Sequence, residues 1–289
     1  MTEVNSQQNI KELFPTMETT TEEVSNETTL FAEPIFHIGN FTVTNSLLNS
    51  WLVVVFLIAL AVIIKKKLAK IPKGIQNVME MLVEAILNLC DSVTHSRKKS
   101  QQVFPIIITL FVFILLNNWS GILPGVGSIG FIERGHGEAI FVPLFRGGTA
   151  DFNTTLALAV MAVIGSNLFG VITIGFYKFF NKFINIKGLL EIPKKILKDP
   201  SIIIVNPIKF FVGIIEIIGE IAKVASLSFR LFGNVFAGEV LLSSMAVIFA
   251  YAVPIPFLFL EIFVGLVQAL IFSLLTLVYF SIASTAEEH

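Results

Sequence analysis

The sequence predicts an all-α, polytopic membrane protein, and two features of its composition carry this prediction. Hydrophobic residues make up 54% of the 289 residues, including 28 phenylalanines, and the mean hydropathy is +0.81. Charged residues make up only 14%, whereas a soluble domain carries roughly 25%. Too little polar surface remains to cover a soluble globule. We therefore expect residues 41–289 to form a single transmembrane domain.

The N-terminal segment differs from the rest of the chain. Residues 1–33 are rich in Thr, Glu, Asn and Ser, and they hold seven of the 21 acidic residues. This composition predicts a flexible acidic tail, which we extend to residues 1–40. No basic segment followed by a short apolar core precedes Trp51, so we expect no cleavable signal peptide.

Five apolar stretches predict membrane spans, because about 20 apolar residues cross a bilayer. They cover approximately residues 47–64, 103–122, 152–176, 207–250 and 257–283. Residues 75–95 instead mix apolar positions with acidic ones, which predicts an amphipathic helix on the membrane surface or against protein. As one helix, 207–250 would be about 66 Å long, against a hydrocarbon core of roughly 30 Å. It must be steeply tilted, and protein must hold it there.

The basic residues predict an orientation. Segments 65–99 and 177–209 hold 15 of the 20 Lys and Arg residues. Lys and Arg stay on the cytoplasmic side of membrane proteins, so both segments are expected in the cytoplasm. The N-terminus and the loop 123–151 would then face outward, with Lys11, Arg134 and Arg146 as their basic residues. An odd number of spans leaves the C-terminus in the cytoplasm.

The long segment 207–250 carries polar residues that are rare inside a membrane. At about 100° per residue, five of them share a sector of roughly 80°, and they are Glu216, Glu220, Lys223, Arg230 and Asn234. Glu239 points to nearly the opposite side. Intramembrane ionisable residues mark an ion pathway or a polar partner by default.

Arg230 is the most informative of these residues, because arginine does not lose its proton in a protein. It needs a carboxylate, a water-filled cavity or another subunit as its partner. An ion pair within the chain is the weaker alternative. Glu216 and Glu220 lie about 15–21 Å away along the axis, and Glu239 points elsewhere.

The last span supplies a matching set of polar residues. Glu261, Gln268 and Tyr279 are spaced by 7 and 11 residues, which places them on one helical face. Interhelical hydrogen bonds in an ordinary bundle would explain Gln268 equally well, but not Glu261. Fitting both helices into the bilayer places Glu239 and Glu261 at similar depth, and it brings Gln268 within reach of Arg230.

Cofactor chemistry is not expected. The chain has a single cysteine, Cys90, and its four histidines lie far apart in the sequence. These counts exclude a disulfide framework and argue against a metal site. There is no GxxxxGK[ST] run to bind a nucleotide, and we expect no nucleic acid partner.

Residues 226–239, Ser-Leu-Ser-Phe-Arg-Leu-Phe-Gly-Asn-Val-Phe-Ala-Gly-Glu, resemble the signature of subunit a of F-type ATP synthases. The resemblance covers about residues 30–289. Four shorter stretches support it, namely 116–124 (Leu-Asn-Asn-Trp-Ser-Gly-Ile-Leu-Pro), 149–157 (Thr-Ala-Asp-Phe-Asn-Thr-Thr-Leu-Ala), 266–272 (Leu-Val-Gln-Ala-Leu-Ile-Phe) and the terminal Glu-Glu-His.

The resemblance implies an ion-translocating stator subunit without a catalytic centre, in the bacterial plasma membrane. Its two long, tilted C-terminal helices would pack against a ring of c subunits, and peripheral-stalk b subunits would be further partners. Arg230 would face the ion-carrying carboxylate of each passing c subunit and block leakage between two aqueous half-channels.

The resemblance also assigns roles along these half-channels. Glu216 and Ser226 match positions on the cytoplasmic side of the arginine, and Asn234, Glu239, Glu261 and Gln268 match positions of the outer half-channel. Many bacterial members carry histidine at the position of Glu261, whereas others carry glutamate, so here two carboxylates would titrate as a coupled pair. Glu220, Lys223, Asp151 and Tyr279 are further candidates for channel lining, although Lys223 matches no position with a known role.

Two other classes of function stay open. A self-contained secondary transporter or channel often shows inverted repeats or helices broken by Gly and Pro at the midplane, and neither is evident here. A purely structural scaffold would leave Arg230 unexplained. The proton is the expected ion, but the choice between proton and sodium is set largely by the ring, which is another chain.

Overall fold

The computed structural model describes residues 32–66, 68–69, 74–123, 125–135, 138–183, 202–248 and 254–285. The structure confirms an all-α membrane protein, because helices dominate these residues. Among the described residues, four helices are long and apolar enough to cross a membrane. They are α2 (Asn45–Lys66), α4 (Arg97–Ile122), α5 (Phe152–Ile174) and α9 (Pro254–Ala283). The others are α3 (Ile75–Thr94), α6 (Phe176–Phe183) and α8 (Ile202–Ile248).

Several helix ends differ from the expected ones, and proline explains two of the differences. α9 begins at Pro254, because a proline in the first turn lacks only an N–H that would have no partner there. α8 begins before Pro207, where we expected it to start, so this proline lies inside the helix close to its N-terminus. α5 ends before Gly175, whose φ of 97° favours glycine and lets the chain turn into α6.

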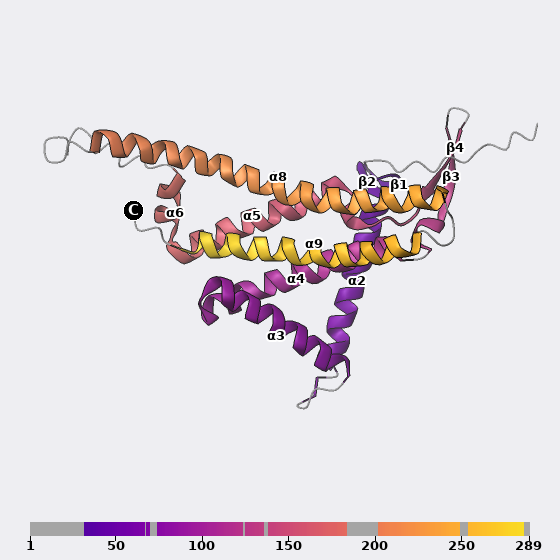
Figure 1. The fold of residues 1–289 in the computed structure, drawn as a ribbon, viewed down its shortest axis with the longest axis horizontal. Coiled ribbons are helices and arrows are strands. Elements are labelled where there is room, and N and C mark those ends of the chain that lie inside the picture. The colour runs from indigo at the N-terminus through magenta and orange to yellow at the C-terminus, as the bar shows by residue number, and fades with distance from the viewer. Residues whose placement is uncertain are drawn as a thin grey trace, which may run out of the picture.

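The structure contains two antiparallel hairpins that the sequence analysis did not predict. β1 (Pro34–Ile38) pairs with β2 (Phe41–Thr44), and β3 (Gly130–Gly135) pairs with β4 (Glu138–Pro143). β1 lies inside the segment that we assigned to the flexible tail. The part of that tail before residue 32 is outside the described residues. Both hairpins lie at one end of the molecule, called the hairpin end below, and α6 lies at the opposite end (Figure 1).

The helix α9 occupies the centre of the bundle. It packs against α4, α5 and α8, while α8 also packs along α5. α8 and α9 run antiparallel, lie side by side near the hairpin end and diverge toward the α6 end (Figure 1). Leu231 of α8, Ile114 of α4 and Phe280 of α9 are almost completely buried between them. This packing orients the polar residues of α8 and α9.

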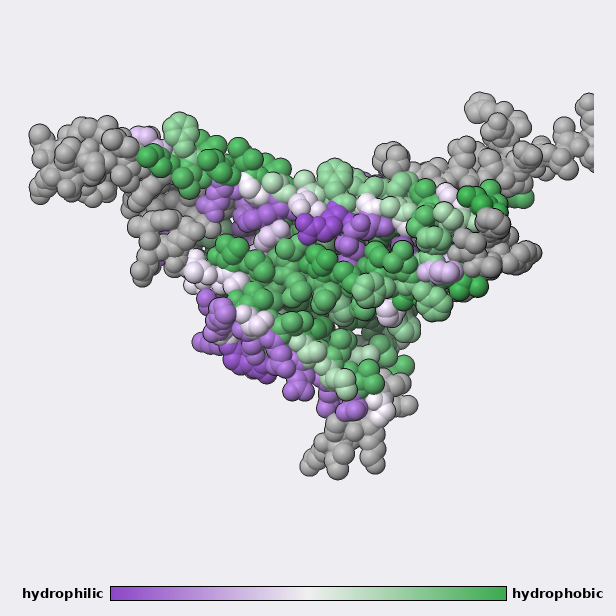
Figure 2. All heavy atoms as spheres, in the orientation of Figure 1, coloured by the Kyte–Doolittle hydropathy of each residue, from purple (hydrophilic) through white to green (hydrophobic). Residues whose placement is uncertain are grey.

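The helices α2 and α3 lie at the side of this bundle (Figure 1). α2 is buried only near its start and then exposes apolar side chains such as Val55 and Ile58, as expected of a surface that faces lipid. α3 covers nearly the same residues as the amphipathic helix expected at 75–95. Its hydrophilic side faces outward (Figure 2), whereas Ile86 and Cys90 are buried.

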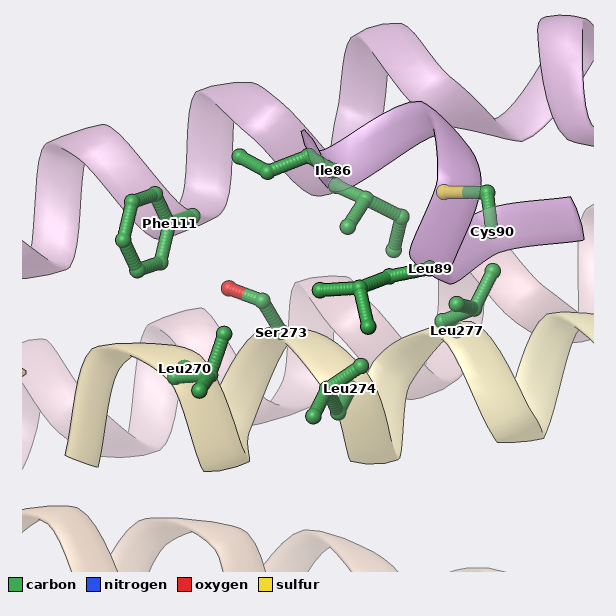
Figure 3. A pocket seen from close by; sticks show the side chains of 9 residues that line it. Ile86, Leu89, Cys90, Phe111, Leu270, Ser273, Leu274 and Leu277 are labelled. Carbon is green, nitrogen blue, oxygen red and sulfur yellow. The ribbon is translucent and has the colours of Figure 1, made fainter. Parts of the chain in front are cut away.

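A small apolar pocket lies where α3, α4 and α9 meet (Figure 3). Cys90, Phe111 and Leu274 contribute to its lining, and its volume of about 10 Å³ barely holds one water molecule. Burial, assisted by the neighbouring Asp91 carboxylate, raises the pKa of the Cys90 thiol to about 11. The pocket contains none of the predicted site residues.

Candidate functional site

An ion pair near the hairpin end links α8 to the segment before α5. Arg146 lies between β4 and the short helix η2 (Gly148–Ala150), and it is only 6% exposed. Its Nε donates to both carboxylate oxygens of Glu239, at 3.0 and 3.1 Å, and its Nη2 donates to Oε2 at 2.7 Å. A bidentate pair of this kind is strong and fixes the orientation of both groups.

Glu261 of α9 lies beside this ion pair. Its side chain is buried, and its carboxylate lies so close to Gly238 of α8 that a Cβ at Gly238 would overlap it. Glu239 and Glu261 interact electrostatically. The structure thus brings together the two glutamates that the helix geometry predicted at similar depth.

Arg230 lies on the exposed side of α8, in the middle of the long helix. Leu227, Ser228 and Leu231 around it are buried, and Phe229 stacks on Phe152 of α5 at 5.1 Å between ring centroids. Arg230 itself is exposed, and its Nη2 donates to Ser226 Oγ at 3.3 Å.

Two partners that the sequence analysis considered for Arg230 do not contact it among the described residues, namely a carboxylate of the same chain and Gln268. Among the described residues, no carboxylate lies within 4.0 Å of its guanidinium. The contact with Gln268 that the helix geometry suggested is not formed either, since the hydrogen bond goes to Ser226 instead.

A second polar cluster joins α8, α5 and α9 nearer the α6 end. Glu220 accepts a hydrogen bond from Asn167 Nδ2 at 3.1 Å and pairs with Lys223 Nζ at 2.5 Å. Lys223 Nζ also lies 5.1 Å from the ring centroid of Tyr279, where a cation is attracted by the ring. This explains the lysine that the sequence left without a role, because it balances the charge of Glu220.

The other predicted residues occupy varied positions. Asn234 is exposed on α8, Glu216 is half-buried on the same helix, and Gln268 lies on the buried face of α9. Hydrophilic residues form a band where α8 faces α9, with hydrophobic residues on both sides (Figure 2). Asp151 caps the N-terminus of α5 by accepting from the Asn153 backbone N–H at 3.2 Å, so the structure gives it a role in holding the helix.

The stretch 116–124 holds α9 in place. Asn118 Nδ2 donates to the Gly265 carbonyl oxygen at 2.9 Å, and Trp119 Nε1 donates to the Ile262 carbonyl oxygen at 3.0 Å. Thr149 in turn donates to Asn118 Oδ1 at 2.5 Å. These contacts attach α9 to α4 and η2 close to Glu261.

Sequence reasoning missed the role of Arg146. It counted this residue only as one of the few basic groups expected outside, although arginine is the residue that best pairs with a carboxylate bidentately. Arg146 and Glu239 are 93 residues apart, and nothing in their spacing connects them. Among the described residues, no group of three His, Cys, Asp or Glu side chains is arranged to hold a metal ion.

Comparison with known proteins gives consistent matches. The sequence model of the family described as ATP synthase A chain matches residues 47–281. ATP synthase subunit a of Syntrophobacter fumaroxidans is 32% identical over 247 residues, which cover 84% of this chain and 85% of that protein. The subunit a of Moorella thermoacetica is 29% identical over 245 residues, covering 85% of this chain and 93% of that protein. That of Geobacter sulfurreducens is 30% identical over 240 residues, covering 83% and 87%.

Proposed function

Because the chain belongs to the ATP synthase A chain family, we propose that it is the ion-translocating stator subunit of a rotary F-type ATP synthase. It lies in the bacterial plasma membrane, with its N-terminus outside and its C-terminus in the cytoplasm. Its partners are a ring of c subunits, peripheral-stalk b subunits and the lipid bilayer. One charge crossing the membrane yields about 2.3 kcal/mol per 100 mV, and this subunit couples that free energy to rotation of the ring.

The exposed Arg230 is the observation that carries this proposal. A permanent cation on an exposed face of a membrane helix, without a carboxylate within reach among the described residues, requires a partner from outside this chain. An ion-carrying carboxylate on the c ring supplies that partner. Arg230 attracts the ionised carboxylate, promotes release of its ion and prevents direct leakage.

The two polar clusters on either side of Arg230 correspond to two half-channels. Asn234, Glu239, Glu261 and Gln268 serve the outer half-channel, whereas Glu216 and Ser226 serve the cytoplasmic one. Glu220, Lys223 and Tyr279 line the same cytoplasmic path, and Asp151 lies near the outer one. The pairing of Glu220 with Lys223 supports this assignment, since it keeps a carboxylate and a cation stable within the protein.

The test is substitution of Arg230 in the complete complex reconstituted in vesicles. Arg230→Ala should abolish ATP synthesis while the subunit still assembles with the ring. Arg230→Lys should also lose most activity, because a compact ammonium replaces the planar guanidinium. Arg97→Ala is the matched control, since Arg97 is exposed and pairs with Asp91 at the α3–α4 junction. Synthesis near the wild-type rate in Arg230→Ala would contradict the proposal.

A further inference from the structure

Arg146 is a buried cation in the outer half of the proposed path. An arginine cannot be neutralised by burial, so its 6% exposure is stable only because a carboxylate compensates it. Glu239 does so with both oxygens. The side chain of Glu239 is 30% exposed, so the pair connects the interior with the surface of α8.

Glu261 lies next to this pair but is held differently. Its carboxylate abuts Gly238, and among the described residues no Lys, Arg or His lies within 4.0 Å of it. Protonating Glu239 would remove the negative charge that pairs with the Arg146 guanidinium. Protonating Glu261 would break no hydrogen bond to a described residue. The two neighbouring carboxylates are therefore not equivalent.

Among the described residues, the elements that pack around α8 and α9 here include α4, α5 and the segment that leads into η2. Glu239 belongs to α8, and Arg146 belongs to the segment before η2. α4 contributes the uncharged Asn118 and Trp119, whose N–H groups are engaged by α9 carbonyls. α5 contributes Asp151, whose carboxylate caps that helix. Among the described residues, Arg146 is thus the one cation that forms an ion pair with either Glu239 or Glu261.

We propose that Arg146 is a positioning residue that keeps Glu239 as a fixed, ion-paired carboxylate and leaves Glu261 as the group that exchanges the ion with the outside. This inference deepens the proposed function and rests on it. With both carboxylates ionised, Arg146, Glu239 and Glu261 together carry a net charge of −1. The three groups become neutral when one proton binds. The bidentate contact with the Arg146 guanidinium also holds Glu239 in one orientation beside Glu261.

The experiment measures potential-driven proton uptake from the outside as a function of outer pH, in vesicles with the complete complex and sodium-free buffer. Arg146→Gln should lower the rate at least about tenfold, because it leaves a carboxylate without its cation. It should also move the midpoint of the outer pH profile upward, since two uncompensated carboxylates hold a shared proton more tightly. Arg146→Lys keeps the charge and should fall between this variant and the wild type.

A double variant separates positioning from folding. Arg146→Gln with Glu239→Gln removes the cation and its partner together, so it should restore both the rate and the midpoint toward wild-type values through Glu261. Arg97→Gln is the control and should leave both unchanged. A wild-type rate and profile in Arg146→Gln would overturn the inference, as would a double variant as impaired as Arg146→Gln alone.

Arg230→Ala in the same vesicles distinguishes the two proposals. The readout for Arg230→Ala is ATP synthesis, because loss of this arginine can let protons leak without coupling. If Arg230→Ala abolishes synthesis while Arg146→Gln behaves as wild type, only the role of Arg146 is wrong. If Arg230→Ala synthesises ATP at the wild-type rate, the proposed function itself fails.

Discussion

Glu261 of α9 and Gly238 of α8 are in close contact in the candidate site. The carboxylate of Glu261 occupies the space where a Cβ at Gly238 would lie. A Cβ at Gly238 would therefore force the Glu261 carboxylate to move, whereas the helix backbones could keep their places. The present position of the Glu261 carboxylate beside α8 uses the space that the glycine leaves free.

Gly238→Ala should displace the Glu261 carboxylate and reduce proton uptake from the outside by at least about tenfold, since a shift of ~1 Å can already cost about 10²-fold. Gly219→Ala on the same helix is the matched control, because its Cβ would meet no described residue within 4 Å beyond its chain neighbours and the backbone of its own helix. The measurement is the uptake rate in reconstituted vesicles. Equal rates in the two variants would show that the contact is not needed.

The polar residues of one helix were predictable, whereas the pairs between elements were not. The spacing of Glu216, Lys223 and Arg230 follows from helical periodicity alone, so their common side could be read from the sequence. The pairing of Arg146 with Glu239 depends on how the segment before η2 folds over α8. No local pattern encodes that contact.

At the scale of elements, hydropathy predicted the spans but not their ends. Apolar stretches identify α2, α4, α5 and α9 because length and composition determine whether a helix can cross a bilayer. The start of α8 before Pro207 was missed, since a proline near a helix start is tolerated rather than required. The local signal for the hairpin β1–β2 is weak, because it consists of the two-residue turn Gly39-Asn40 between two short strands.

The docking of α9 on α4 gives a prediction about stability. Asn118→Ala removes the donor to the Gly265 carbonyl and the acceptor for Thr149, and it should destabilise the protein by about 1–3 kcal/mol. Thr109→Val is the control, because the Thr109 hydroxyl is exposed and bonds only to the Pro105 carbonyl of its own helix. Thermal unfolding of the purified complex measures the difference. A Tm of Asn118→Ala equal to that of Thr109→Val would contradict the proposed anchoring.

At the scale of the whole molecule, the distribution of basic residues predicts the orientation in the membrane. Single cysteines at Ser6 and Glu133 should react with an impermeant thiol reagent added outside, and one at Lys187 only with reagent on the cytoplasmic side. Ser6 and Lys187 lie outside the described residues. Reversed labelling would overturn both the orientation and the assignment of the half-channels.

The native Cys90 does not interfere with this experiment and serves as its control. Its thiol is buried, and its pKa is raised to about 11. The thiolate is the reactive form, and its fraction increases only as the pH approaches that value. The otherwise unmodified protein should therefore stay unlabelled from either side between pH 7 and about 9. Rapid labelling at pH 7 would show that α3 does not stay packed against α4 and α9 at this thiol.

Two side-chain contacts of α8 also restrict how this helix can move. Asn167 holds Glu220 on one side of Arg230, and Arg146 holds Glu239 on the other. At 1.5 Å per residue these contacts lie about 15 Å and about 13.5 Å from Arg230 along the helix. Arg230 thus lies nearly midway between two points at which α8 is attached to neighbouring segments. We expect a lateral force on its guanidinium to be transmitted to α5 and to the segment before η2, and α8 to bend little.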